Sequence, residues 1–469
     1  IEHIQKAHPI VILLLVKLFN CMIAYGIVPS AFGQGLCVPI PKVSSIQAAM
    51  SKEDFRGITI SPTISKIFEK TILKIFGKYF DSNECQFGFK KSSSCSYAIF
   101  SLKQVTDHYT CGGSTVNICS MDISKAFDKV NYYCLLDKLC KRGLPIEILN
   151  ILFAWFDCTT IVVKWGNERS SCYGLLAGVR QGGVLSPFLF GLYVDELLDK
   201  LHLSRLGCTV KGAMCNAFMY ADDLILLTAS LCNLQQLILI CEQELSDIGL
   251  SFNFSKCHIM RVGKKYKNVC IPICISQNVI KFCEEMRYLG VYVRSGLILK
   301  FNFDQAKRKF YASANGIISK VGTLKPDIVL SLCNSFAIPC LLYATEAMLL
   351  NKSERKTLDN TVRRLFMKLF HTADPSVIAH CQYYMYFLQP SDNIIVRTFI
   401  FYQSLINSSS TIVQIIFSLF NKNISNFGEK YNIGETNLNN NCGGTFVSPM
   451  ILWCLLSVIL GMSDILVFF

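Results

Sequence analysis

The amino-acid sequence predicts an α+β protein built from several domains. Its 469 residues exceed one ordinary domain and suffice for two to four. Up to about residue 295, short apolar segments typical of strands alternate with segments of helical periodicity, and beyond that point the pattern is helical and basic. Hydrophobic residues make up 51% of the chain and charged residues 17%, which excludes a largely disordered protein.

Two mainly apolar segments are compared first with membrane spans. Residues 10–16 are followed by Lys17, so they fall short of the roughly 20 apolar residues that a span needs, and they lack the features of a secretory signal. They predict a buried helix. Residues 450–460 are similar in length. They predict a core helix or sequence translated beyond the natural end of the domain, with a tail anchor as the minority alternative.

The remaining elements are predicted from periodicity in chain order. Short strands are expected at residues 35–40, 117–123 and 288–293, and two strands joined by a tight turn at residues 217–228. Helices are expected at residues 62–76 and 231–248, and an Asn-rich loop or linker at residues 423–441. The apolar residues of the first of these helices share one face, opposite its lysines: Ile64, Ile67, Phe68, Ile72, Ile75 and Phe76.

Charge and cysteine content narrow the class of protein. Lys and Arg number 46 against 33 Asp and Glu, a formal net charge of +13 that favours a polyanionic partner. No two of the 23 cysteines stand in C-x-x-C spacing, so no zinc ribbon is predicted. Reduced thiols in a nuclear or cytoplasmic protein that is not secreted are the simpler interpretation. Because the chain opens at Ile1, we expect an N-terminally truncated fragment of a longer product.

Three aspartates stand at predicted strand ends. Asp122 closes one strand, and the adjacent Asp222 and Asp223 lie in the turn of the predicted hairpin. Neighbouring carboxylates in apolar surroundings repel each other, and a hard cation such as Mg²⁺ relieves that repulsion. The pattern predicts a site for two Mg²⁺ ions, with Mn²⁺ as a substitute, for nucleotidyl transfer. An isolated Asp-Asp pair is more often a plain hairpin turn, so the neighbouring residues decide.

The neighbouring residues resemble those of reverse transcriptases. Tyr220-Ala221-Asp222-Asp223 resembles their catalytic turn, and Asp122 with Ala126-Phe127-Asp128 resembles the preceding acidic strand. Further blocks, in family order over about residues 1–371, are similar to reverse transcriptases of non-LTR (LINE-type) retrotransposons. These blocks are Pro39-Ile40-Pro41-Lys42, Asp54-Phe55-Arg56-Gly57-Ile58, Ser65-Lys66-Ile67-Phe68-Glu69-Lys70, Gln86-Phe87-Gly88-Phe89-Lys90, Val179-Arg180-Gln181-Gly182-Gly183-Val184-Leu185-Ser186-Pro187, Asn253-Phe254-Ser255-Lys256, Tyr288-Leu289-Gly290-Val291 and Leu342-Tyr343-Ala344-Thr345-Glu346.

The resemblance implies a right-hand polymerase fold. Residues 1–22 would form an N-terminal helical extension, residues 23–294 the fingers and palm, and residues 295–380 a helical thumb. Residues 381–469 would form a C-terminal region whose structure the resemblance does not specify. The implied activity is RNA-directed DNA polymerisation on an RNA template, with a DNA or RNA primer and dNTPs as partners. No stable membrane association is expected, and the oligomeric state is not predicted.

The resemblance also implies individual roles. Asp122, Asp222 and Asp223 would be the catalytic metal ligands, with Asp223 contributing less directly, and Lys256 would protonate the leaving pyrophosphate. Phe127 would lie under the sugar and exclude a 2′-hydroxyl, although an ordinary core phenylalanine is an equal alternative from the residue alone. The other nucleotide-binding roles are support of the templating base and nucleotide by Gln181 and Gly182, and triphosphate binding by Arg56 and Lys66.

Contacts to a nucleic-acid duplex are predicted on the basic helices. Lys307-Arg308-Lys309 and Arg363-Arg364 are the candidates, with charged helix surfaces that only aid solubility as the alternative. Three positions depart from the family pattern: Gly57 replaces Pro, Lys90 replaces Arg, and residues 92–94 replace Gly-Arg-Ser. These departures bear on template and triphosphate affinity.

Alternative functions stay open. A group II intron maturase or a viral RNA polymerase is the nearest enzymatic alternative. The block Ser124-Lys125-Ala126-Phe127-Asp128 favours a retrotransposon enzyme, and Ala221 before Asp222 disfavours a viral RNA polymerase. From another functional class, a catalytically inactive or domesticated nucleic-acid-binding relic of such an element is the second hypothesis.

Overall fold

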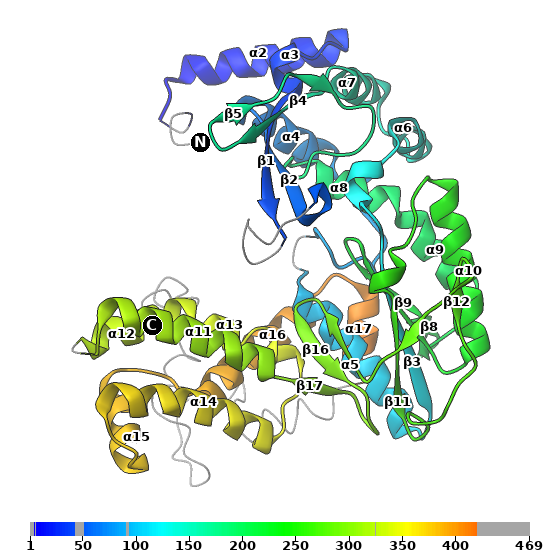
Figure 1. Ribbon diagram of the computed structural model, residues 1–469. Coiled ribbons are helices and arrows are strands. Elements are labelled where there is room, and N and C mark those ends of the chain that lie inside the picture. Colours follow the sequence, from blue (N-terminus) through cyan, green and yellow to red (C-terminus); the bar gives the residue numbers. More distant parts are fainter. Residues whose placement is uncertain (1–3, 5, 43–50, 91–92, 324, 420–469) are drawn as a thin grey trace, which may run out of the picture.

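The computed structural model describes residues 4, 6–42, 51–90, 93–323 and 325–419. The expected loop at residues 423–441 and the apolar segment at residues 450–460 lie outside this part of the chain. Figure 1 shows the described chain bent like the letter C, with the N-terminal elements at the top, a central sheet at the right and helices α11 to α15 at the lower left. Within the described residues, no helix has the length and apolar character needed to cross a membrane.

The N-terminal part is built around one mixed sheet. Its strand order is β2-β1-β4-β5, with β6 paired to β4; β1 runs antiparallel to β2 and parallel to β4. Phe68 connects the helices beside this sheet, because its ring lies 4.8 Å from the ring of Phe19 and 5.8 Å from that of Trp155. The elements are α2 (Pro9–Tyr25), α3 (Ser30–Gly33), β1 (Gln34–Pro41), β2 (Phe55–Ile60), α4 (Thr63–Phe76), α7 (Ile146–Asp157), β4 (Thr160–Trp165), β5 (Glu168–Arg169) and β6 (Tyr173–Gly174).

Two helix faces differ from the prediction. Residues 10–16 form a helix, but the prediction that it is buried is wrong: of α2, only Phe19 and Met22 are buried, and Ile10 to Leu14 are 38–61% exposed. Apolar residues occur on every side of α2, and only one side of a helix can pack against a neighbouring element. Helix α4 buries Ser65, Phe68, Glu69 and Ile72, whereas Ile64 and Ile75 are exposed. The buried face of α4 is therefore rotated away from Ile64 and Ile75 and toward Ser65 and Glu69.

The central sheet carries the predicted acidic strands. Its order is β14-β11-β3-β10-β9, with β3 in the middle and antiparallel to both β10 and β11. Buried residues of β3 such as Ile118 and Met121 belong to the core, against which helices α5 and α10 pack. The predicted strands here and the predicted helix at residues 231–248 are confirmed. The elements are α5 (Cys95–Cys111), β3 (Thr115–Asp122), β9 (Ala217–Tyr220), β10 (Asp223–Thr228), α10 (Leu231–Asp247), β11 (His258–Gly263) and β14 (Lys281–Phe282).

The single strand expected at residues 288–293 is wrong. The chain forms a hairpin there, with β15 (Glu285–Tyr288) antiparallel to β16 (Val291–Arg294), and β17 (Lys300–Asn302) adds to β16. The hairpin turns at Leu289 and Gly290, whose φ angles are +44° and +87°. A left-handed leucine is uncommon, and the signal for the turn in this apolar segment is Gly290.

The helices after residue 303 return to the central sheet. The Glu346 carboxylate accepts a hydrogen bond from Ser96 at the start of α5 and pairs with Arg397 of α16, at 2.7 and 3.0 Å. Glu84 accepts a 3.0 Å hydrogen bond from the backbone N–H of Ile412 in α17. The basic, helical prediction for this part is confirmed. Its helices are α11 (Asp304–Val321), α12 (Pro326–Phe336), α13 (Ile338–Leu341), α14 (Lys352–Phe370), α15 (Pro375–Tyr384), α16 (Pro390–Ile406) and α17 (Thr411–Ser418).

Asp392 should make the stability of this helical part depend on pH. Burial, and then the charge of Asp359 on α14, raise its pKa to about 6. A carboxyl group whose pKa is higher in the folded state stabilises the fold when protonated, and this contribution is lost as pH rises through about 6. On lowering the pH from about 7 to about 5, the wild-type protein should therefore gain about 1 kcal/mol in free energy of unfolding from protonation of Asp392. Asp392→Asn should lack this gain. Urea unfolding of both proteins at the two pH values measures this, and equal pH dependence would contradict it.

Candidate active site

Strand pairing brings the three predicted aspartates together. β3 and β10 are neighbours in a register that places Asp122 directly opposite Asp223. β9 and β10 form a hairpin in which Tyr220 is opposite Asp223, so Ala221 and Asp222 are the two turn residues. The backbone N–H of Ile123 donates to the carbonyl of Asp222 at 3.2 Å, which extends the ladder to the turn. The predicted tight acidic hairpin is thus confirmed, and it lies beside the end of β3.

A neighbouring segment holds this turn in a left-handed conformation. Ala221 has φ +57°, which is uncommon for a residue with a side chain. The buried Gln86 side chain compensates by accepting from the backbone N–H of Ala221 at 3.0 Å and donating to its carbonyl at 3.4 Å. A Cβ on Gly88 would lie 2.5 Å from the backbone nitrogen of Ala221, so only glycine fits there. Sequence reasoning noticed this block as a motif but assigned it no role.

The carboxylates influence one another electrostatically. Burial, and next the negative charge of Asp122, raise the pKa of Asp222, while Lys256 and Arg56 lower it. Burial, followed by the charges of Asp222 and Asp122, raises the pKa of Asp223 to about 6. Both aspartates therefore bear negative charge at a cost that a nearby cation relieves.

The cation already present in this cluster is a lysine. Nζ of Lys256 lies 2.7 Å from Oδ2 of Asp122, and its side chain is largely exposed while that of Asp122 is mostly covered. Lys256 ends a short 3₁₀ turn (Phe254–Lys256), which the backbone attaches to the sheet because the N–H of Asn253 donates to the carbonyl of Asp122 at 2.8 Å. The predicted proton donor and the first predicted metal ligand are thus adjacent.

The donor set suits magnesium without forming a closed cage. Within the described ranges, no three His, Cys, Asp or Glu side chains lie together in a way that could hold a metal ion by themselves. Mg²⁺ is usually bound through one or two carboxylates and completes its shell with water and substrate phosphates. Three partly buried carboxylates at adjoining strand ends, two of them with raised pKa values, match that requirement. The residues fit the ion.

Phe127 occupies a fixed position near the acidic strand. It belongs to the 3₁₀ turn Ala126–Lys129, and its half-buried ring stacks on the buried Phe190 of α8 (Ser186–Tyr193), with centroids 4.8 Å apart. Phe89 contacts the same ring edge-on at 6.1 Å. The backbone carbonyl of Phe127 accepts from Val179 N–H at 2.8 Å. That bond connects this turn to the loop containing Gln181.

The loop with Gln181 and Gly182 lies between this turn and strand β2. The side-chain Nε2 of Gln181 donates to Oδ1 of Asp128 at 3.3 Å. The backbone carbonyl of Gln181 accepts from the backbone N–H of Thr59 at 2.7 Å. Gly182 has φ +119°, and a Cβ on it would lie 2.5 Å from the carbonyl oxygen of Thr59. The close approach of the two backbones therefore requires a glycine at position 182. Gly182 is also exposed.

The predicted triphosphate residues differ in their placement. Arg56 is exposed on β2 and is close enough to lower the pKa of Asp222. Lys66 is half-buried on α4 and, in the described part of the chain, makes no hydrogen bond or ion pair with the aspartates. Lys90, which replaces the family's Arg, has a structural role: its Nζ donates hydrogen bonds to the backbone carbonyls of Ser82 and Asn83 at 2.6 Å each.

Comparison with known proteins identifies the family. Residues 40–293, more than half of the chain, match the family model described as reverse transcriptase (RNA-dependent DNA polymerase). The chain belongs to the reverse transcriptase family. Its α+β architecture is the right-hand fold of reverse transcriptases, and the matched segment contains all three aspartates, Phe127, Gln181 and Lys256.

The relatives with similar sequences include proteins of retrotransposable elements. The chain is 25% identical over 286 residues to the Pol polyprotein of the type-2 retrotransposable element R2DM of Drosophila melanogaster, covering 59% of this chain and 27% of the relative. It is 24% identical over 359 residues to that of element R2 of Popillia japonica (74% and 49%). It is 23% identical over 356 residues to the RNA-directed DNA polymerase from mobile element jockey of Drosophila funebris (71% and 37%). The resemblance to non-LTR reverse transcriptases is confirmed.

These relatives are longer than the part they share with this reverse transcriptase. The chain spans between about a quarter and a half of the length of the three relatives named here. Among solved structures, apo telomerase from Candida tropicalis aligns with 95% of this chain and 73% of its own, at a TM-score of 0.46 and 12% identity.

Proposed function

We propose that this chain is an RNA-directed DNA polymerase that copies an RNA template into DNA as part of a non-LTR retrotransposon. The observation that carries the proposal is the register of β3 and β10, which sets Asp122 opposite Asp223 with Asp222 in the adjoining turn. All three carboxylates lie at the end of a largely buried sheet, inside the segment that matches the family, and the pKa values of Asp222 and Asp223 are raised. Nucleotidyl transfer needs such an arrangement.

Each residue of the site has a proposed task. Asp122, Asp222 and Asp223 would hold two Mg²⁺ ions, or Mn²⁺ in their place. Bound there, the ions would activate the attacking 3′-hydroxyl and neutralise charge on the leaving pyrophosphate. Lys256, which is exposed and adjacent to Asp122, would give its proton to the pyrophosphate. Arg56 is the better supported triphosphate ligand because it is exposed and its charge lowers the pKa of Asp222. The proposed role of Lys66 rests on the sequence motif alone.

The nucleotide and duplex would bind to parts contributed by several segments. Gln181, Gly182 and Phe127 would contact the dNTP, and the RNA template with its DNA or RNA primer would lie along basic helices. Lys307, Arg308 and Arg364 line a groove between α11 and α14, which suits phosphate contacts. Arg363 instead donates to the carbonyl of Ala373 at 3.2 Å. We assign residues 23–294 to fingers and palm and residues 295–380 to the thumb, and place the protein in the nucleus or cytoplasm.

Primer extension tests this function. The purified chain should extend a DNA primer annealed to an RNA template when supplied with dNTPs and Mg²⁺. EDTA should abolish extension because, without a divalent cation, the negative charges of the aspartates and of the phosphates repel each other, and excess Mg²⁺ or Mn²⁺ should restore it. Fluorescence anisotropy on the same duplex, at several salt concentrations, measures binding separately. A folded chain that binds the duplex but never extends the primer with either metal would establish the inactive relic instead.

A further inference from the structure

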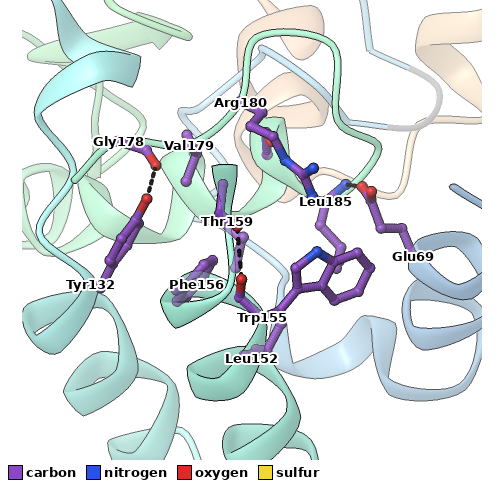
Figure 2. A pocket seen from close by; sticks show the side chains of 12 residues that line it. Glu69, Tyr132, Leu152, Trp155, Phe156, Thr159, Gly178, Val179, Arg180 and Leu185 are labelled. Carbon is purple, nitrogen blue, oxygen red and sulfur yellow. Dashed lines mark hydrogen bonds between the residues drawn. The ribbon is translucent and has the colours of Figure 1, made fainter. Parts of the chain in front are cut away.

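A buried carboxylate lies behind the loop that carries Gln181 and Gly182. Glu69, on α4, is 3% exposed and lines a small cavity together with Trp155, Arg180 and Leu185, as Figure 2 shows. Its Oε2 accepts hydrogen bonds from the backbone N–H groups of Val184 and Leu185, the latter at 2.7 Å. These N–H groups directly precede α8, so Glu69 fixes the point where the loop enters that helix.

Arg180, at the other end of the loop, lines the same cavity as Glu69 and is influenced by its charge, although no ion pair within 4.0 Å joins the two side chains among the described residues. Burial lowers the pKa of Arg180, and the charge of Glu69 opposes that effect. The Arg180 guanidinium lies 5.9 Å from the centre of the Trp155 ring and donates to the carbonyl of Phe32 at 3.4 Å. Oε1 of Glu69 is buried and has no hydrogen-bond partner within the described residues. An unpaired buried charge is costly, so each of these two groups stabilises the other.

The two attachments flank the residues that would contact the nucleotide. Arg180 precedes Gln181, and Val184 follows Gly183, so Glu69 acts on both ends of a three-residue segment. Gly183 allows this close packing, because a Cβ there would lie 2.5 Å from Oγ of Ser186 and 3.5 Å from Oε2 of Glu69. On the front of the loop, Thr59 is in contact with Gln181 and Gly182. The segment is therefore held from behind by Glu69 and from the front by β2.

We propose that Glu69 is a positioning residue for the nucleotide site: through Arg180 and the N–H groups of Val184 and Leu185, it holds Gln181 and Gly182 where the incoming dNTP binds. This inference rests on the proposed polymerase function. Glu69 does not touch the nucleotide itself. Its removal should therefore weaken dNTP binding without weakening duplex binding, because the groove between α11 and α14 lies on other elements.

The test compares Glu69→Gln, Glu69→Ala and a matched control, Asp195→Asn. Asp195 is also a buried carboxylate that accepts a backbone N–H (from Asn83, 2.6 Å) and pairs with an arginine, Arg142, but it lies at the start of α9 (Asp195–Leu203). Glu69→Ala loses both hydrogen bonds and the charge, so KM for dNTPs should rise about 10-fold with duplex Kd within about 2-fold. Glu69→Gln keeps an acceptor oxygen and should raise KM about 3-fold. Asp195→Asn should lower Tm and leave KM unchanged.

A second readout does not depend on activity. Trypsin can cleave after Arg180 only when the loop opens, so cleavage there, followed by mass spectrometry, should be about 10-fold faster in Glu69→Ala than in wild type and unchanged in Asp195→Asn. If Glu69→Ala does not fold, the Gln variant carries both measurements. Wild-type KM and wild-type cleavage in the folded Glu69 variants would overturn the inference. A wild-type chain that fails to extend primers would instead refute the proposed function, and the cleavage comparison would still decide whether Glu69 holds the loop.

Discussion

Asp222→Asn is expected to abolish primer extension while leaving the protein folded and able to bind a template–primer duplex. The amide has the shape of the carboxylate but carries no charge, and a metal contributes several kcal/mol to this kind of transition state, so the rate should fall by a factor on the order of a thousand or more. The fold should not suffer. Burial and Asp122 raise the pKa of Asp222, so its negative charge is unfavourable without a cation, and Tm should stay equal or rise.

Single-turnover extension, thermal melting and duplex anisotropy on one preparation measure the three expectations together. Asp137→Asn is the matched control, because Asp137 is an exposed carboxylate of α6 (Tyr132–Lys141) whose ion pair with Lys141 is on the surface. It should behave like wild type in all three measurements. Wild-type extension by Asp222→Asn would remove Asp222 from the metal site. Loss of extension together with loss of folding would show that its role is structural.

The acidic centre could be predicted from sequence because its parts are local. A strand that ends in Asp122 and a hairpin that turns at Ala221-Asp222 are each specified by alternation over a few residues. Which strands become neighbours is not local, and the resemblance to reverse transcriptases supplied it. The register that places Asp122 opposite Asp223 is an observation of the structure, since antiparallel pairing of β3 with β10 by itself permits several registers.

The parts that sequence reasoning missed depend on distant contacts. Gln86 and Glu69 are polar residues in apolar surroundings, and their partners are 135 and 115–116 residues away along the chain. The apolar periodicity of α4 said nothing about Glu69, and the structure buries it where two backbone N–H groups, those of Val184 and Leu185, donate to its Oε2. A useful signal was available in the motif itself: a glutamate among Ile67, Phe68 and Ile72 is costly unless it is paired. The exposure of α2 had no comparable signal.

Phe127→Ala is expected to admit ribonucleotides. Stacking on Phe190 and the edge-on contact with Phe89 leave the Phe127 ring little freedom, so it can act as a rigid steric barrier. The backbone beneath it is held independently by the bond from Val179 N–H to the carbonyl of Phe127 and by that from Gly178 N–H to the carbonyl of Val130. Truncation should therefore open space without moving the loop. The ratio of kcat/KM for a dNTP to that for the matching ribonucleotide should fall about 100-fold, with dNTP incorporation little changed.

Phe89→Ala separates direct exclusion from indirect support. Phe89 is 40% exposed and its ring is nearly perpendicular to that of Phe127 at 6.1 Å, whereas the ring of Phe190 stacks on Phe127 at 4.8 Å. Because the stacked contact survives in this variant, sugar selectivity should stay within about 2-fold of wild type. If both variants lose selectivity equally, the cluster acts as a unit and Phe127 is not the barrier by itself. If Phe127→Ala keeps full selectivity, the ring is a packing residue, and the 2′-hydroxyl must be excluded by another group of the site.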